Sequence, residues 1–175
     1  MHDKENAEFI PVNIAVLTVS DSRDWDSDTS GALLAERIET AGHHLADRKI
    51  VIDDRDEIQR TVKTWIDDPN VDAVISTGGT GLTGRDVTPE AVRPLYEKEI
   101  EGFSVIFHQV SFESVGLSTL QSRASAGVAK GTFIFTLPGS NGAVKDGWDK
   151  VIAGQLDARQ RPCNLVELMP RLMET

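Results

Sequence analysis

Short, strongly apolar runs alternate with amphipathic segments along this chain, and that alternation limits its possible folds more than any other feature. Residues 13–19 (NIAVLTV), 49–52 and 71–76 (VDAVIS) are short, rich in β-branched side chains and followed by turn-forming residues. Such runs are typical of strands buried on both faces of a sheet. Because amphipathic segments separate them, the order strand–helix–strand–helix–strand predicts parallel strands joined by right-handed crossovers.

Helical periodicity appears between and after these strands. Asp28 or Ser30 is the candidate N-cap of the first helix, and Gly42 is its candidate terminator. A further apolar run at 132–137 (TFIFTL) predicts another strand. Apolar residues recur at helical spacing in the segments 34–41, 58–66, 103–110 and 144–152, which predicts a helix in each.

Length and charge restrict the class of protein. With 175 residues, we expect one domain at 13–175 behind a flexible tail at 1–12. The chain has 28 acidic and 18 basic residues, a net charge of −10, which argues against binding nucleic acid or an anionic membrane surface. No apolar run approaches the ~20 residues of a membrane-spanning helix. The single Cys163 and the polar N-terminus indicate a cytoplasmic protein.

Turn-forming, glycine and acidic residues follow the predicted strands. They lie at 20–21, 53–54, 77–79 and 138–140. Each group alone is ordinary loop chemistry. Because ligands of an open parallel sheet bind outside the carboxyl ends of its strands, the four groups together predict one cleft.

The densest of these groups is a glycine-rich loop. Gly78, Gly79, Gly81 and Gly84 fall within seven residues, so the backbone can turn tightly and approach a ligand closely. We interpret this loop, with Thr80 inside it, as a cradle for a phosphate or a pterin, the alternative being a turn without a ligand. Its match to G-x-G-x-x-G does not indicate a nicotinamide site, because it follows the third strand rather than the first, and the residues after Gly84 run through Asp86, Pro89 and Pro94 without the strand that should end in an acidic residue.

Three acidic residues lie where the cleft is predicted. Asp86 follows the glycine loop and is interpreted as a ligand or metal contact, as the N-cap of a helix beginning near Pro89, or as both. Asp53 and Asp54 end the second strand. Mg²⁺ keeps several waters and needs only one or two carboxylates beside substrate phosphates, so Asp53 with Asp86 is the predicted metal pair.

The remaining candidate binding residues supply hydroxyl, carboxylate, guanidinium or backbone groups. They are Ser20, Asp21, Thr88, Ser122, Arg123, Pro138, Gly139 and Ser140. Local capping is the alternative for Ser20 and Asp21, and a surface ion pair is the alternative for Arg123. The sequence has neither zinc-ligand spacing nor a G-x-S-x-G elbow, and nothing near Cys163 indicates a lowered thiol pKa.

Four motifs occur in an order that is specific. They are 77–81 (TGGTG), 85–90 (RDVTPE), 120–123 (LQSR) and 137–140 (LPGS). Over residues 13–164 the chain resembles the molybdenum cofactor biosynthesis family of MoaB, MogA and the gephyrin G domain. Residues 118–124 and 156–164 are most similar to the MoaB branch.

The resemblance implies a three-layer α/β/α fold with a mostly parallel sheet, assembled as a homotrimer or a hexamer. It implies binding of molybdopterin, a pterin dithiolene with a terminal phosphate, and Mg²⁺- and ATP-dependent adenylylation of that phosphate with release of pyrophosphate. The family's two catalytic aspartates fall on Asp53 and Asp86, and its ligand segments on 78–81, Ser122 and 139–140. Asp54 remains the alternative to Asp53, because active members usually read Pro-Asp-Glu where this chain reads Ile-Asp-Asp.

Two functions fit the sequence. One is a molybdopterin adenylyltransferase, and the other is a non-catalytic carrier or scaffold that binds molybdopterin in the same pathway. The sequence distinguishes neither trimer from hexamer nor molybdenum from tungsten. Phe103, Phe107 and Phe112 exceed what one helix face over a small sheet requires, so we predict that this region packs against another subunit.

Overall fold

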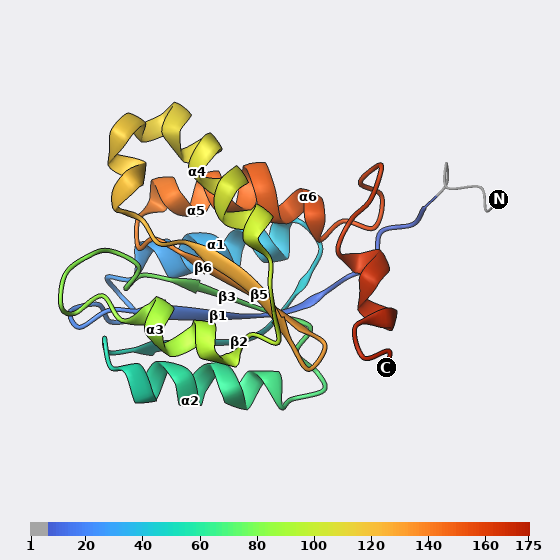
Figure 1. Cartoon of the computed structure of the whole chain (residues 1–175), viewed down its shortest axis with the longest axis horizontal. Helices are drawn as coiled ribbons and strands as arrows, with labels where there is room; N and C mark the ends of the chain where they lie inside the picture. The colour runs from blue at the N-terminus through green and yellow to red at the C-terminus, as the bar shows by residue number, and fades with distance from the viewer. Residues whose placement is uncertain (1–6) are drawn as a thin grey trace.

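One six-stranded sheet with helices on both faces organises residues 7–175, which are those described by the structure, a computed structural model (Figure 1). The strands are β1 Asn13–Val19, β2 His44–Val51, β3 Ala73–Thr77, β4 Lys98–Glu99, β5 Ser125–Ala129 and β6 Thr132–Leu137. They lie in the order β2-β1-β3-β6-β5-β4. β2, β1, β3 and β6 pair in parallel, whereas β5 runs antiparallel to both β6 and β4.

Helical segments connect the strands. The α-helices are α1 Thr29–Thr40, α2 Arg55–Ile66, α3 Thr88–Val92, α4 Glu101–Val115, α5 Asn141–Gly147 and α6 Ala153–Gln155. The 3₁₀ segments are η2 Arg93–Leu95, η3 Gly116–Gln121 and η5 Val166–Arg171, and the π-helical segment η4 Trp148–Ile152 joins α5 to α6. Within the described residues, the helices are too short or too polar to cross a bilayer.

Two hydrophobic clusters, one on each face of the sheet, form the core. Ile14 and Val16 of β1 belong to the cluster that contains side chains of α1, α4 and α5, whereas Ala15 and Leu17 belong to the cluster with α2 and α3. The alternation follows from the two-residue period of a strand, and it explains why the whole run is apolar. Figure 1 shows α2 and α3 on one side of the sheet and α1, α4 and α5 on the other. The predicted three-layer α/β/α fold is confirmed.

Acidic N-caps fix where the first two helices begin. The Asp28 carboxylate accepts a hydrogen bond from the Gly31 N–H at 3.0 Å, so Asp28 rather than Ser30 caps α1. The Asp54 carboxylate accepts from the Glu57 N–H at 2.9 Å and caps α2. Both helices therefore start immediately after loops at the carboxyl edge of the sheet, which places those loops beside the predicted cleft.

Part of the predicted tail instead packs on the core. Residues 1–6 of the predicted 1–12 tail lie outside the described residues. Val12 is buried, and its N–H donates to Nδ1 of His43 at 3.1 Å. The Phe9 ring lies 5.0 Å from the His43 ring, and the Arg159 guanidinium lies 5.0 Å from the Phe9 ring centre. Residues 9–12 are thus held by specific contacts that apolar patterning alone does not reveal.

Candidate functional site

The loops at the carboxyl edge of the parallel strands enclose a polar cavity of about 580 Å³. It is lined by Val19, Ser20, Ser22, Arg23, Asp53, Gly78, Gly79, Thr80, Gly81, Asp86, Ser111, Val115, Ser118, Thr119, Gln121, Ser122, Pro138, Gly139, Ser140, Ala143 and Asp146. The lining comes from the ends of all four parallel strands and from α4, η3 and α5. The predicted single cleft is therefore present in the structure.

Most of the residues selected from the sequence meet in this cavity. Ser20, Asp53, Gly78, Gly79, Thr80, Gly81, Asp86, Ser122, Pro138, Gly139 and Ser140 all line it. Asp21, Thr88 and Arg123 do not line it. Their side chains are instead engaged with neighbouring loops, so the structure places them as supports of the cavity rather than as its surface.

The two glycines that begin the loop after β3 are required by its backbone. Gly78 and Gly79 have φ angles of 107° and 67°, in the left-handed region that favours glycine. A Cβ on Gly78 would collide with the carbonyl oxygen of Val19, and one on Gly79 would meet the Thr88 hydroxyl and lie 3.0 Å from Asp53 Oδ1. The loop therefore passes between β1 and the acidic residue after β2, with no room for larger side chains.

The carbonyl groups of this loop are all held by the protein. The Gly78 oxygen accepts from the Thr88 hydroxyl at 2.9 Å, and the Gly79 oxygen from the Thr88 N–H at 3.0 Å. The Thr80 oxygen accepts from the Arg123 N–H at 3.0 Å, and the Gly81 oxygen from Arg123 Nε at 2.8 Å. Thr88 and Arg123 thus act on the side of the loop opposite to its N–H groups.

Two donors of the same loop have no acceptor. Within residues 7–175, the N–H groups of Gly79 and Thr80 make no hydrogen bond, although Thr80 is 2% exposed. A buried N–H without a partner is costly, and successive backbone N–H groups in a turn form a concave anion site. The loop is therefore built to receive an anionic or carbonyl oxygen from a ligand.

The structure distinguishes the two neighbouring aspartates after β2. Asp53 lines the cavity, whereas the Asp54 carboxylate is occupied as the N-cap of α2. Asp86 reaches the same cavity, but it does not cap α3 as one interpretation predicted. Its carboxylate instead accepts from the N–H and the hydroxyl of Thr83, at 2.9 and 2.6 Å, which closes the turn after the glycine loop.

The two cavity aspartates differ in acidity. Partial burial raises the pKa of Asp53, and the nearby carboxylates of Asp21 and Asp86 raise it further. Burial also acts to raise the pKa of Asp86, but the hydrogen bonds from Thr83 and from the Gly81 backbone outweigh it, so the pKa of Asp86 is lowered. The like charges around Asp53 make this end of the cavity a favourable place for a cation.

A divalent cation fits this acidic end on chemical grounds. The Gly79 and Gly81 positions lie directly against the Asp53 and Asp86 carboxylates, where any side chain would intrude. No group of three or more His, Cys, Asp or Glu able to hold a metal occurs in the part of the chain that the structure describes. A cation held here would therefore take its other ligands from water or from substrate oxygens, as Mg²⁺ commonly does in proteins.

Arg23 is the basic residue of the cavity that was not selected from the sequence. Its side chain donates to the Gly139 carbonyl at 2.9 Å and to the Ser30 hydroxyl at 2.5 Å, and it lies 3.8 Å from the Asp28 carboxylate. It is the one cationic side chain among the described residues that line the cavity. Its position in the loop after β1 is the sequence signal for it, whereas Arg123, which stands in the LQSR motif, supports the glycine loop from outside the cavity.

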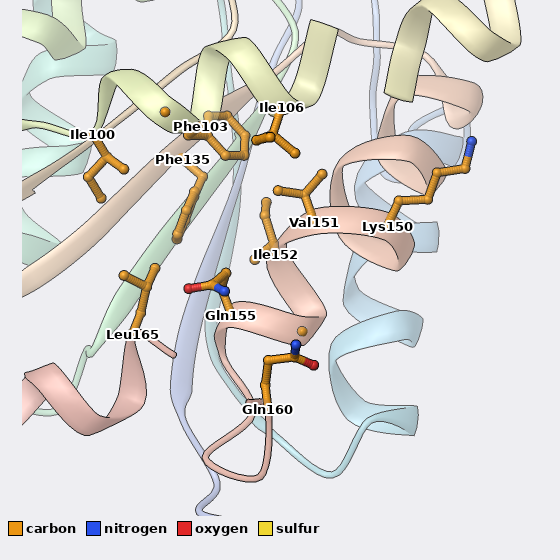
Figure 2. A pocket seen from close by; sticks show the side chains of 12 residues that line it. Ile100, Phe103, Ile106, Phe135, Lys150, Val151, Ile152, Gln155, Gln160 and Leu165 are labelled. Carbon is orange, nitrogen blue, oxygen red and sulfur yellow. The ribbon is translucent and has the colours of Figure 1, made fainter. Parts of the chain in front are cut away.

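A second cavity, of about 410 Å³, has a different character (Figure 2). Its walls are mostly apolar and come from α4, β6, η4 and the C-terminal segment, with Phe103, Phe135 and Leu165 converging on the space. The Lys150 ammonium points away from it and pairs with Asp146 at 2.8 Å. Its polar lining consists of the Gln155 and Gln160 side chains and Lys150, which is already paired, so the polar cavity is the better candidate for a phosphate site.

Comparison with known proteins agrees with this geometry. Residues 15–158 match the family described as "Probable molybdopterin binding domain". Molybdenum cofactor biosynthesis protein B of Escherichia coli K12 is 52% identical over 159 residues, covering 91% of this chain and 94% of that protein. The chain therefore belongs to the molybdenum cofactor biosynthesis protein B family.

Other members of the MoaB family are similar in sequence and in structure. The Bacillus subtilis protein B is 46% identical over 146 residues, covering 83% of this chain and 86% of that one. A crystal structure of a molybdenum cofactor biosynthesis protein B has a TM-score of 0.82 at 41% identity, covering 84% of this chain and 92% of that chain. The tungsten cofactor synthesizing protein MoaB from Pyrococcus furiosus has a TM-score of 0.72 at 38% identity, covering 81% and 90%. The family match spans every residue that lines the polar cavity.

Proposed function

We propose that this protein acts in molybdenum cofactor biosynthesis as a molybdopterin adenylyltransferase, with the polar cavity as its active site. The phosphate oxygen of molybdopterin attacks the α-phosphorus of ATP, a new P–O bond forms, and the bond to the β-phosphate breaks to release pyrophosphate. The observation that carries the proposal is the pair of unpartnered N–H groups at Gly79 and Thr80, facing a cavity that also contains Asp53 and Asp86.

Binding and positioning account for what the protein contributes. The N–H groups of Gly79 and Thr80 donate to phosphate oxygens, and Arg23, held at the Gly139 carbonyl after β6, supplies positive charge. Asp53 and Asp86 would hold Mg²⁺, which neutralises charge on the triphosphate when bound. Phosphoryl-group transfer asks for little covalent chemistry from a protein, so this arrangement of fixed dipoles and charges suffices.

Pyrophosphate release from molybdopterin, ATP and Mg²⁺ tests the proposal. We expect Asp53→Ala and Asp86→Ala each to reduce release by about 100-fold, because each removes a charge that acts on the reacting phosphates. The matched control is Asp54→Ala, which removes the neighbouring carboxylate but only the cap of α2. It should cost about 1 kcal/mol of stability and retain release.

The alternative function gives a different result in the same assay. A carrier or scaffold would bind molybdopterin without releasing pyrophosphate, and the three alanine variants would then bind equally well. Molybdopterin binding by wild-type protein without any pyrophosphate release would therefore refute the enzymatic proposal and leave the binding role.

A further inference from the structure

Asp21 joins three loops that surround the acidic end of the cavity. Its Oδ1 accepts from the Asp53 N–H at 3.0 Å and from Arg85 Nη2 at 2.8 Å, and its Oδ2 accepts from Arg85 Nε at 2.8 Å. Asp21 follows β1, Asp53 follows β2, and Arg85 lies between the glycine loop and α3. One carboxylate therefore bridges segments separated by up to 64 residues in the sequence.

Both cavity aspartates depend on this bridge for their position. Asp21 anchors the Asp53 backbone through its carboxylate, and the Asp21 backbone N–H in turn interacts with the Asp53 carboxylate, so residues 21 and 53 hold each other in place. Arg85 immediately precedes Asp86, whose own carbonyl oxygen accepts from Arg123 Nη2 at 2.8 Å. Asp86 is thus fixed between two arginines, one tied to Asp21 and the other to the glycine loop.

We propose that Asp21 and Arg85 are positioning residues that set the spacing of Asp53 and Asp86, and hence the affinity of the site for a divalent cation bound with ATP. This inference rests on the proposed function. Neither side chain lines the cavity, and each nitrogen that Arg85 directs at Asp21 is 2.8 Å from a carboxylate oxygen. The pair therefore acts on the cation through the two aspartates that it holds.

If the Asp21–Arg85 ion pair only stabilised the fold, its removal would affect stability and not cation affinity. The pair is exposed, with side-chain exposures of 64% for Arg85 and 43% for Asp21. Exposed ion pairs contribute little to the stability of a fold. Groups that orient metal ligands, in contrast, change metal affinity by about 10- to 100-fold when removed.

Binding of Mn²⁺ in the presence of ATP, followed by the electron paramagnetic resonance signal of free Mn²⁺, tests the inference without using turnover. We expect Asp21→Ala to weaken Mn²⁺ binding about tenfold. Asp21→Asn, which retains an acceptor for the Asp53 N–H, should weaken it less, and Arg85→Lys should be intermediate. ATP binding measured in EDTA and the melting temperature should stay at wild-type values.

The control removes an equally exposed, long-range ion pair at the opposite edge of the sheet. Asp67→Asn breaks the 2.8 Å contact between Asp67 and Lys130 and should leave Mn²⁺ binding unchanged. If Asp21→Ala folds poorly, Arg85→Gln gives the same test from the other partner.

The outcomes separate the two proposals. Wild-type Mn²⁺ binding with equal binding by Asp21→Ala and Arg85→Gln would overturn the positioning role and leave the proposed function standing. Wild-type protein that binds no Mn²⁺ with ATP and releases no pyrophosphate would overturn both. An equal loss of Mn²⁺ and metal-free ATP binding would also overturn the positioning role, because it would indicate general damage to the cavity.

Discussion

Asp28 is the most heavily hydrogen-bonded buried carboxylate near the site. It accepts from the Thr18 hydroxyl at 2.7 Å, from the Gly31 N–H at 3.0 Å and from Arg48 Nη2 at 2.7 Å, and its side chain is fully buried. Burial alone would raise its pKa, but the hydrogen bonds from Arg48, Thr18 and Gly31 outweigh that effect, so the pKa of Asp28 is lowered. Its charge therefore stabilises the folded state.

We predict that Asp28→Asn lowers the free energy of unfolding by about 3 kcal/mol at neutral pH, because it leaves the partly buried Arg48 charge without its partner. A lowered folded pKa means that the contribution is complete above the unfolded value of 3.8 and is lost as pH falls below it through the folded value. Urea unfolding of both proteins across acidic pH measures this. A difference between them that does not shrink on acidification would contradict the prediction.

Single residues were predictable from the sequence where their role was local, and unpredictable where it was not. The cap at Asp28, one of two candidates, follows from its place before an amphipathic segment. The sequence could not rank Asp53 over Asp54, because the choice depends on which carboxylate the helix end uses. The pairing of Asp21 with Arg85 had no sequence signal, since it arises only once two distant strand ends meet.

At the level of elements, α4 is apolar on two opposite faces. Of the three phenylalanines in this region, Phe103 and Phe107 are buried in the core of this chain. Phe112 and Val105 are instead 55% and 66% exposed on the outer face, and exposed apolar residues continue into η3 at Leu117. A helix that is apolar all round is normally covered, and an apolar patch of this kind marks an interaction surface.

We propose that a second copy of this chain covers the outer face of α4. Val105→Glu with Phe112→Glu should then convert the oligomer to a monomer, because burying two carboxylates without partners is costly. Light scattering after size exclusion measures the mass, with Leu168→Glu as a control on a different exposed apolar residue. A wild-type protein that is monomeric at micromolar concentration would contradict this proposal.

The elements that the sequence missed lack the apolar pattern on which such predictions rest. β5 reads Ser-Ala-Gly-Val-Ala, and its Gly127 faces the Tyr96 ring so closely that a Cβ would collide with it. β2 begins at His44 rather than at residue 49. Its first half was not predicted because β2 is an edge strand and that half is largely polar. The buried parallel strands were predictable because helices cover both of their faces, which makes each strand a continuous apolar run.

The whole molecule is acidic, with a net charge of −10. Under the proposed function, a polyphosphate would therefore approach against a repulsive field, and the local amides and Arg23 would bind it only after contact. We predict that the association rate of a fluorescent ATP analogue in EDTA rises about threefold between ~10 mM and ~100 mM salt, because salt screens the repulsion. Stopped-flow fluorescence measures it, and a rate that falls with salt would indicate attraction instead.

The separate origin of the two sides of the cavity has a consequence for engineering. After α3 the chain leaves the parallel core, and α4 and η3 supply the Ser111, Val115, Ser118 and Gln121 side of the cavity. The acidic end of the cavity comes from other segments, at the ends of β2 and the glycine loop. Grafting residues 101–121 from a relative would thus remodel one side of the cavity, while the side that carries Asp53 and Asp86 keeps its native scaffold.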